Sequence, residues 1–259
     1  MSSISSPPVY APVSVTDLSI GYPGLVLMRG LTFSVPLGAV FVIMGGSGSG
    51  KTTLLRNMIG LMEPLSGDVR FGDESFTRGD ADVRERLTKR FGVLFQTGAL
   101  WSSMTLAENV GLPMHQFTRL ATSEIRDLVS LKLDLVGLKG FERYYPSQIS
   151  GGMQKRAGIA RAMALDPEIL FFDEPSAGLD PLTSRRLDDL ILELRESLGT
   201  TIVVVTHELD SIFAIGTDSV FLDTESQTMI AQGNPRELRE HSTDPRVRSF
   251  LTRDTGVAT

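Results

Sequence analysis

The chain of 259 residues contains no cysteine, a single tryptophan and three histidines. The absence of cysteine excludes disulfide bonds and thiolate metal sites. No apolar run approaches the ~20 residues that a membrane-spanning helix needs, and the amino terminus lacks the basic segment and apolar stretch of a secretory signal. We therefore expect a soluble, cytoplasmic protein that acts at a membrane only through a partner.

The charge balance argues against nucleic acid as a partner. The net charge is −6, and no basic stripe is present that could displace counterions from a phosphate backbone. Acidic residues (Asp82 and Glu85) interrupt the densest basic group, and we interpret that group as a solvated helix face; it comprises Arg84, Arg86, Lys89 and Arg90. The length and the 41% hydrophobic content suit one large or two small globular domains.

A glycine-rich stretch at Gly45–Thr52, reading GGSGSGKT, fits the phosphate-loop pattern G-x-x-x-x-G-K-[ST]. The apolar run Val40–Met44 before it predicts a buried strand, and a helical pattern continues from Thr53 to Ile59. Backbone N–H groups of such a loop, together with the start of the helix, form an anion site. We predict a triphosphate-binding loop in which Lys51 reaches the β- and γ-phosphates and Thr52 ligates Mg²⁺; its residues are Gly45, Gly46, Ser47, Gly48, Ser49, Gly50, Lys51, Thr52 and Thr53.

Two adjacent carboxylates end another apolar strand, Ile169–Phe172. Because side chains alternate along a strand, at least one of Asp173 and Glu174 is expected to point inward. Beside a phosphate loop, Asp173 would hold Mg²⁺ through water, whereas Glu174 would face the γ-phosphate and orient the attacking water.

Two further polar residues follow predicted strands. His207 ends the β-branched run Thr201–Thr206, at the edge where a parallel sheet binds ligands, so we expect a functional role for it. Gln96 follows the run Phe91–Phe95 and is either a ligand of Mg²⁺ or its water, or an ordinary strand-end glutamine. The other histidines, His115 and His241, have no supporting motif, and we assign them no role.

The segment from Trp101 to about Leu165 is mostly helical in pattern and is expected to be an insertion into the α/β sheet. Within it, Ser150 stands at the N-cap position of a helix running to Ala164, and Gly151 and Gly152 free backbone N–H groups. This is a second potential anion site. Lys155 and Arg156 are candidate phosphate ligands, although a solvated face is the default interpretation of both.

The remaining chain is assigned by pattern. Residues 1–12 are rich in Ser and Pro and are expected to be flexible. The loose alternation of Val13–Ile20 predicts an edge strand, and Tyr22, between Gly21 and Pro23, is on its own a turn aromatic. The other predicted elements are a strand at Leu31–Val35, strands at Asp68–Phe71 and Phe91–Phe95 around a helical segment, a helix after Pro181 that buries Leu187, Leu190, Ile191, Leu194 and Leu198, a hairpin of Val220–Leu222 with Thr228–Ala231, and a charged helical tail from Pro235.

The motifs, taken in order, resemble those of an ABC-transporter ATPase subunit. They are the phosphate loop, Gln96, Ser150-Gly151-Gly152, Phe172-Asp173-Glu174, Asp180 and His207, and the resemblance covers nearly everything from Val13 to Gly233. It implies an α/β P-loop NTPase of the ABC ATPase type, with a mainly parallel sheet, an antiparallel β subdomain and a helical subdomain at about 101–165. The domain would span 13–233 and the tail 234–259.

The resemblance also implies roles for residues. Two copies would clasp two ATP molecules, so that the phosphate loop of one faces Ser150-Gly151-Gly152 of the other, and Asp180 would link the two sites. Tyr22 would stack on adenine, and Gln96 would sense Mg²⁺ and the membrane subunit. Glu174 would be the catalytic base, and His207 would hold the γ-phosphate. The chain departs from the usual L-S-G-G-Q signature, because it has Ile149 and Met153 at the two ends and therefore lacks the glutamine side chain of that signature.

A narrower resemblance points to the ATPases of the maintenance-of-lipid-asymmetry (Mla) phospholipid transporters. It rests on Leu94–Leu100, on the Ser-Gly-Gly-Met variant and on Asp244–Leu251. Membership would imply an integral membrane permease, an MCE-domain lipid-binding protein and a small STAS-domain subunit as partners. The chain would then lie on the cytoplasmic face of the inner membrane.

Two alternatives share the nucleotide machinery. The cargo could be an amino acid, a metal or a drug, since only the subfamily stretches and the permease distinguish them. A non-transport ABC ATPase is the other alternative, but the chain lacks the long coiled-coil insertion of the DNA-repair members and has room for one domain, whereas translation factors carry two.

Overall fold

The structure is a computed structural model that describes residues 11–253. Except for its last two positions, the expected flexible segment 1–12 lies outside the described residues, as does the end of the tail. Within residues 11–253, none of the helices has both the length and the apolar character needed to cross a membrane.

A six-stranded sheet forms the centre of the molecule, in the order β10-β9-β3-β8-β7-β6. Its neighbouring strands are parallel from β9 to β6, and only β10 runs antiparallel, beside β9. The strands are β3 (Val40–Gly45), β6 (Phe91–Leu94), β7 (Ile169–Asp173), β8 (Thr201–Val205), β9 (Asp218–Asp223) and β10 (Thr228–Gln232). The predicted buried strands and the closing hairpin are therefore confirmed.

Three strands of this sheet are buried along their whole length, namely β3, β7 and β8. Continuous apolar sequence is typical of a parallel sheet that is covered on both faces. Alternation along β3 distributes the side chains accordingly. Phe41 and Ile43 join the core beneath the second sheet, whereas Val42 and Met44 pack against helices on the opposite face.

The second sheet is antiparallel, with the order β2-β1-β4-β5. Its strands are β1 (Val13–Tyr22), β2 (Leu25–Val35), β4 (Ser66–Phe71) and β5 (Glu74–Ser75). The prediction of an edge strand at Val13–Ile20 is wrong, because β1 pairs with β2 on one side and β4 on the other. Its alternation is loose because the register shifts after Val15, after Leu18 and after Ile20, as at β-bulges.

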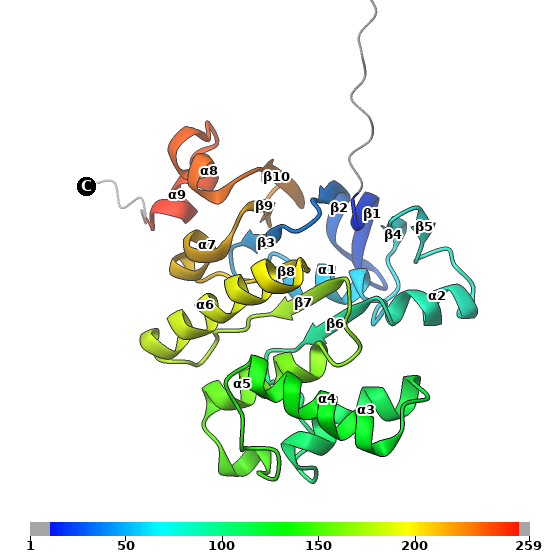
Figure 1. The fold of residues 1–259 in the computed structure, drawn as a ribbon. Coiled ribbons are helices and arrows are strands. Elements are labelled where there is room, and N and C mark those ends of the chain that lie inside the picture. Colours follow the sequence, from blue (N-terminus) through cyan, green and yellow to red (C-terminus); the bar gives the residue numbers. More distant parts are fainter. Residues whose placement is uncertain (1–10, 254–259) are drawn as a thin grey trace, which may run out of the picture.

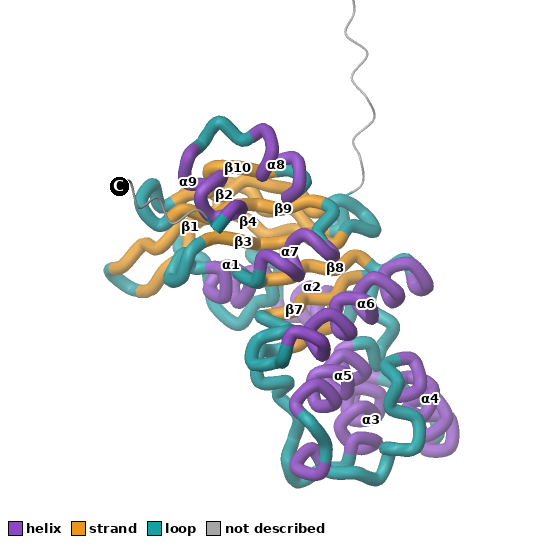
Figure 2. Tube along the Cα trace, turned by 90° about the vertical axis from the view of Figure 1, so that its left-hand side faces the viewer, coloured by secondary structure: helices purple, strands orange, loops and turns teal. Residues whose placement is uncertain are grey.

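The helices lie on both faces of the central sheet and beyond one of its edges (Figures 1 and 2). Helices α3, α4 and α5 gather beyond β6, on the side away from the antiparallel sheet (Figure 1). The helices are α1 (Lys51–Met58), α2 (Ala81–Thr88), α3 (Leu106–Phe117), α4 (Thr122–Leu135), η1 (Pro146–Gln148), α5 (Gly151–Ala162), α6 (Pro181–Leu198), α7 (Leu209–Ile215), α8 (Pro235–His241) and α9 (Pro245–Thr252).

The apolar stripe of α6 packs as expected, with one exception. Leu187, Leu190, Ile191 and Leu194 are buried against α5 and the sheet. Leu198 is 44% exposed, so its assignment to the core is wrong. It is the last residue of the helix, which ends at Gly199 in a left-handed conformation, beyond the edge of the core.

The basic group on and after α2 is the expected ion-paired surface, with one exception. Arg90 lies beyond the end of α2, only 24% of its side chain is exposed, and it pairs with Glu168, next to β7. Arg84 pairs with Glu63, Arg86 with Glu74 and Lys89 with Glu85. Such exposed pairs contribute little to stability.

Candidate functional site

The phosphate loop connects β3 to α1. Gly45 has a φ of 148° and Gly50 a φ of 77°, a region in which residues other than glycine are strained. A Cβ on Gly45 would also lie 2.4 Å from the carbonyl oxygen of Leu222. No side chain caps the start of α1, so its backbone N–H groups are available to an anion.

Lys51 is folded into the loop. Its Nζ donates hydrogen bonds to the carbonyl oxygens of Gly45, at 3.0 Å, and Gly46, at 2.9 Å. Burial lowers the pKa of Lys51, and the carboxylates of Glu174 and Asp173 oppose that shift. The ammonium is thus held beside the loop, near two carboxylates, where it can neutralise a phosphate oxygen.

Thr52 and Asp173 are brought together from two elements. The Thr52 hydroxyl donates to Asp173 Oδ1 at 3.0 Å. Burial raises the pKa of Asp173, while the Thr52 hydrogen bond lowers it and the neighbouring Glu174 raises it. A hydroxyl and a carboxylate are oxygen ligands of the kind that Mg²⁺ prefers. Among residues 11–253 no three His, Cys, Asp or Glu side chains form a metal cluster.

Glu174 and His207 form a close pair at the ends of β7 and β8. Nδ1 of His207 lies 2.7 Å from Glu174 Oε1. An ionised Glu174 requires the proton on Nδ1, which leaves Nε2 free. The other carboxylate oxygen, Oε2, is buried without a partner among the described residues. Glu174 also has a φ of 47°, a strained conformation of the kind that clusters at active sites.

Apart from Asp173, these groups line one open pocket of about 490 Å³. The structure thus brings together the phosphate loop, Gln96, Glu174 and His207. It adds two residues that the sequence patterns did not indicate, Leu27 from β2 and Phe250 from α9. The ring of Phe250 packs edge-on against that of Phe221, with 5.1 Å between the ring centroids. The sequence indicated the stretch around Phe250 only through the family resemblance, and no local pattern placed Phe250 near the phosphate loop.

Tyr22 and Asp180 do not line this pocket. Tyr22 ends β1, is 45% exposed and pairs with Leu25 across the hairpin. Asp180 is the N-cap of α6, and its carboxylate accepts hydrogen bonds from the backbone N–H groups of Leu182 and Thr183. The Thr183 hydroxyl, which also donates to this carboxylate, lowers the pKa of Asp180.

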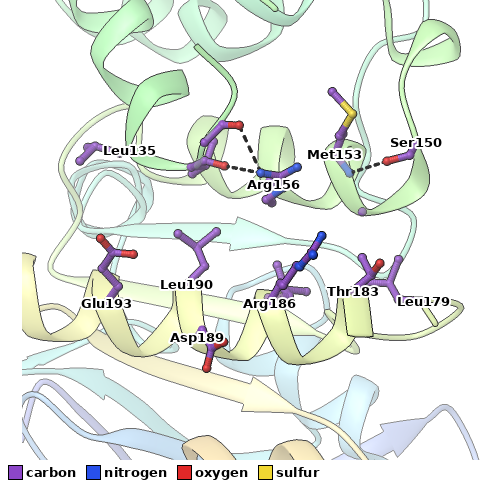
Figure 3. A pocket seen from close by; sticks show the side chains of 14 residues that line it. Leu135, Ser150, Met153, Arg156, Leu179, Thr183, Arg186, Asp189, Leu190 and Glu193 are labelled. Carbon is purple, nitrogen blue, oxygen red and sulfur yellow. Dashed lines mark hydrogen bonds between the residues drawn. The ribbon is translucent and has the colours of Figure 1, made fainter. Parts of the chain in front are cut away.

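Ser150 caps α5, as the sequence predicts, because its hydroxyl accepts from the backbone N–H of Met153 (Figure 3). With Gly152 it lines a second pocket of about 450 Å³ between α5 and α6, which shares no lining residue with the first. A Cβ on Gly152 would lie 2.5 Å from the Thr183 side chain, so α6 requires a glycine there. Gly151 beside it is exposed.

The default expectation of a solvated face is wrong for Lys155 and Arg156. Lys155 is buried, and its Nζ donates to the carbonyl oxygens of Gln96 and Glu174. Arg156 is half-buried and donates to the carbonyls of Val136 and Gly137, which end α4 (Figure 3). Sequence periodicity placed both on one helix but carried no information about the loops that approach it.

The fold and the site define a class. The parallel sheet carries a glycine-rich loop at the carboxyl end of one strand. Carboxylates, a histidine and a glutamine follow the neighbouring strands. This arrangement is typical of a P-loop nucleotide-binding protein. A family model described as "ABC transporter" matches residues 28–177. The chain belongs to this family, and it is an ATP-binding and ATP-hydrolysing subunit of an ABC transporter.

Curated relatives extend the match over nearly the whole chain. The intermembrane phospholipid transport system ATP-binding protein MlaF of Escherichia coli K12 is 38% identical over 239 residues, which are 92% of this chain and 88% of MlaF. The probable ribonucleotide transport ATP-binding protein mkl of Mycobacterium leprae is 38% identical over 244 residues, 94% of this chain and 70% of mkl. The resemblance to the Mla ATPases is thus confirmed.

Solved structures confirm the fold. A dimeric ATP-binding cassette in a post-hydrolysis state with ADP and Pi has a TM-score of 0.75 and 30% identity, and the match covers 86% of this chain and 98% of that chain. The cbiO1 protein of Clostridium perfringens, part of the ABC transporter complex cbiONQ, has a TM-score of 0.80 and 25% identity over 95% and 99% of the two chains. Family membership implies a dimer within a membrane transport complex.

Proposed function

We propose that this chain powers phospholipid transport through ATP-driven closure of two copies. The observation that carries the catalytic part is the 2.7 Å contact between Glu174 and His207 beside the phosphate loop. The cargo rests on the similarity to MlaF, which is named for intermembrane phospholipid transport.

ATP is the substrate of the first site. Its phosphates would lie on the backbone N–H groups of residues 45–53, with the Lys51 ammonium against the β- and γ-phosphates. Tyr22, although outside the phosphate pocket, would stack on the adenine. Thr52, Asp173 and Gln96 would hold Mg²⁺, which when bound would offset the charge of the phosphates.

Glu174 is the proposed general base. Water attacks the γ-phosphorus and the bond to the β–γ bridging oxygen breaks, so that ADP and phosphate form and the proton passes to Glu174. Oε1 is held by His207, whereas Oε2, which is buried without a partner within residues 11–253, would accept the proton once the attacking water lies beside it. His207 would hold the γ-phosphate. Its Nε2 donates to a phosphate oxygen when both ring nitrogens are protonated, because Nδ1 already donates to Glu174.

Ser150, Gly151 and Gly152 would complete the site of a second copy. They lie at the start of α5, away from the phosphate loop of their own chain, and the solved cassettes of this fold include dimers. Asp180, the N-cap of the helix that packs on Gly152, would lie between the two sites.

The domain limits and partners follow from the same proposal. Residues 13–233 would form the ATPase domain, with the helical subdomain at about 101–165 and the tail at 234–259. The chain would bind an integral membrane permease, an MCE-domain protein and a STAS-domain subunit, and would lie on the cytoplasmic face of the inner membrane.

Purification of the chain with its native membrane partners tests the cargo. We expect phospholipid to co-purify with the complex, and transfer of labelled phospholipid between vesicles to require ATP. The name of mkl supports a second candidate, a ribonucleotide. ATP-dependent uptake of labelled ribonucleotide without any transfer of lipid would favour that candidate and would contradict the lipid proposal.

A further inference from the structure

Lys155 is a buried cation that the proposed mechanism does not use. It lies on α5, five residues after Ser150, and only 6% of it is exposed. Its Nζ donates to the carbonyl oxygen of Gln96 and, at 3.3 Å, to that of Glu174. One side chain thus joins α5 to the segments that follow β6 and β7.

The surroundings of Lys155 show that it does not serve to neutralise a single acid. Burial lowers its pKa, and the carboxylates of Asp173, Glu174 and Glu208 oppose that shift. The hydrogen bonds of its ammonium within residues 11–253, however, go to main-chain carbonyls and not to these carboxylates. A buried ammonium is costly unless it is hydrogen-bonded, so these two bonds fix both carbonyls relative to α5.

The bond to Glu174 acts on a strained residue. Glu174 has a φ of 47°, and its carbonyl also accepts from the backbone N–H of Ala177. A residue other than glycine persists in this conformation only when its surroundings hold it. If the Lys155 bond were lost, the backbone could relax and carry the carboxylate away from His207.

We propose that Lys155 is a positioning residue for ATP hydrolysis, which holds the Gln96 and Glu174 carbonyls on α5 and thereby keeps the Glu174 carboxylate in place. The inference rests on the proposed function, in which Glu174 accepts the proton of water. Because Ser150 caps the same helix, a movement of α5 against the sheet would reach Glu174 through Lys155.

The test compares Lys155→Met and Lys155→Arg in the full chain, purified with its membrane partners. In Lys155→Met we expect kcat to fall at least about tenfold, because displacement of a catalytic group by about 1 Å is enough for a large loss. The Kd for ATP is expected to stay within about twofold, because Lys155 does not line the phosphate pocket. Lys155→Arg keeps a cationic donor and is expected to recover most of the rate.

Hydrogen exchange supplies a local readout. In Lys155→Met the amides of residues 174–177 are expected to exchange faster, since the Ala177 N–H donates to the carbonyl that Lys155 holds. If Lys155→Met does not fold, Lys155→Gln, which keeps a neutral donor, is measured in the same way and is expected to lie between Lys155→Met and Lys155→Arg.

Lys132 offers a matched control, because it is a second buried lysine on a neighbouring helix. It lies on α4, its side chain is 4% exposed, and it pairs with Asp166 instead of a site segment. Lys132→Met should lower the melting temperature and leave kcat unchanged. The inference is overturned if Lys155→Met keeps kcat within twofold of wild type, loses kcat and ATP affinity together, or loses no more kcat than Lys132→Met.

Glu174→Gln distinguishes a wrong role for Lys155 from a wrong proposed function. If Glu174→Gln hydrolyses ATP at the wild-type rate, the catalytic proposal itself is wrong. If Glu174→Gln is inactive while Lys155→Met is fully active, the role of Lys155 alone is wrong.

Discussion

The two helix starts with exposed glycines differ in what surrounds them. The start of α1 has no side-chain cap and faces Lys51, Gln96, Glu174 and His207 in one pocket. The start of α5 is capped by its own Ser150 and lies against Leu179 and Thr183, with no titratable side chain of the catalytic set beside it.

One chain thus holds a nearly complete catalytic centre and a separate, incomplete anion-binding surface. At α1, charge and hydrogen-bonding groups from three strand ends converge on the loop. At α5, the glycines supply backbone donors but no general base and no metal ligand. In the dimer that we propose, the start of α5 in one copy binds the nucleotide held by the phosphate loop of the other copy.

Glu174→Gln removes the proposed general base at the α1 site and has the largest expected effect. Loss of the general base is expected to slow hydrolysis by about 10²–10⁴-fold, while ATP still binds because the phosphate loop is intact. With hydrolysis blocked, the two copies should stay closed, so light scattering should detect a dimer in Mg-ATP. Glu237→Gln, an exposed acid on α8, serves as the control; a monomeric Glu174→Gln in Mg-ATP would count against closure.

Lys51→Ala removes the ammonium that the phosphate loop offers to ATP. Removal of a charged donor is expected to weaken ATP binding by about 10–100-fold, because such hydrogen bonds contribute roughly 1.5–3 kcal/mol. Calorimetry measures the Kd directly. Arg56→Ala removes an exposed cation from the same helix without touching the pocket lining, and it should bind ATP normally. Unchanged affinity in Lys51→Ala would remove the basis for the whole phosphate site.

Ser150→Ala tests the incomplete surface. ATP binding to the monomer should be unchanged, whereas hydrolysis by the dimer should fall by about three- to tenfold, since one neutral hydrogen bond is lost and the backbone donors remain. Ser150 also caps α5, so Asp80→Ala, which removes the cap of α2, is the matched control for the roughly 1 kcal/mol that a cap contributes. A loss of monomer affinity in Ser150→Ala would show that the two surfaces are not separate.

The catalytic side could be predicted well from the sequence, because its signals are local. Glycine spacing, apolar strands and the polar residue after each strand follow from backbone geometry and sheet topology. These signals located the loop, Asp173, Glu174, His207 and Gln96, and they placed the N-cap at Ser150. Their catalytic and binding roles remain predictions that the variants above test.

What the sequence could not provide depends on contacts between distant segments. Lys155 was expected to be solvated because a charge on a helix is usually exposed, yet the turns after β6 and β7 bury it. Phe250 reaches the phosphate pocket only because α9 packs back on β9. Val13–Ile20 was assigned to an edge because bulges disturb its alternation, and only pairing on both sides shows that it is internal.

The smallest effect on catalysis is expected from Asp188, which lines neither pocket and lies on α6, facing Ser211 of α7. It is 5% exposed, its Oδ2 accepts from the Ser211 hydroxyl at 2.9 Å, and Oδ1 is buried without a partner among the described residues. The pKa of Asp188 is raised to about 6, mainly by burial and further by the nearby carboxylates of Glu208 and Asp189. The hydrogen bond from Ser211 and the charge of Arg185 oppose this shift.

The sign of the resulting pH dependence follows from proton linkage. The folded state binds the proton of Asp188 more tightly than the unfolded state, so this group favours folding at low pH, and its contribution is lost as the pH rises towards the folded pKa of about 6.

Asp188→Asn cannot titrate. The stability of the variant relative to wild type should therefore rise by about 2 kcal/mol between pH 4.5 and pH 7.5, as measured by urea unfolding at each pH, with ATP affinity unchanged. Glu193→Gln, an exposed acid on the same helix, should show no such trend. A constant difference between Asp188→Asn and wild type across this range would mean that the carboxylate is already ionised in the folded protein at pH 4.5, so that α6 and α7 would enclose a buried charge.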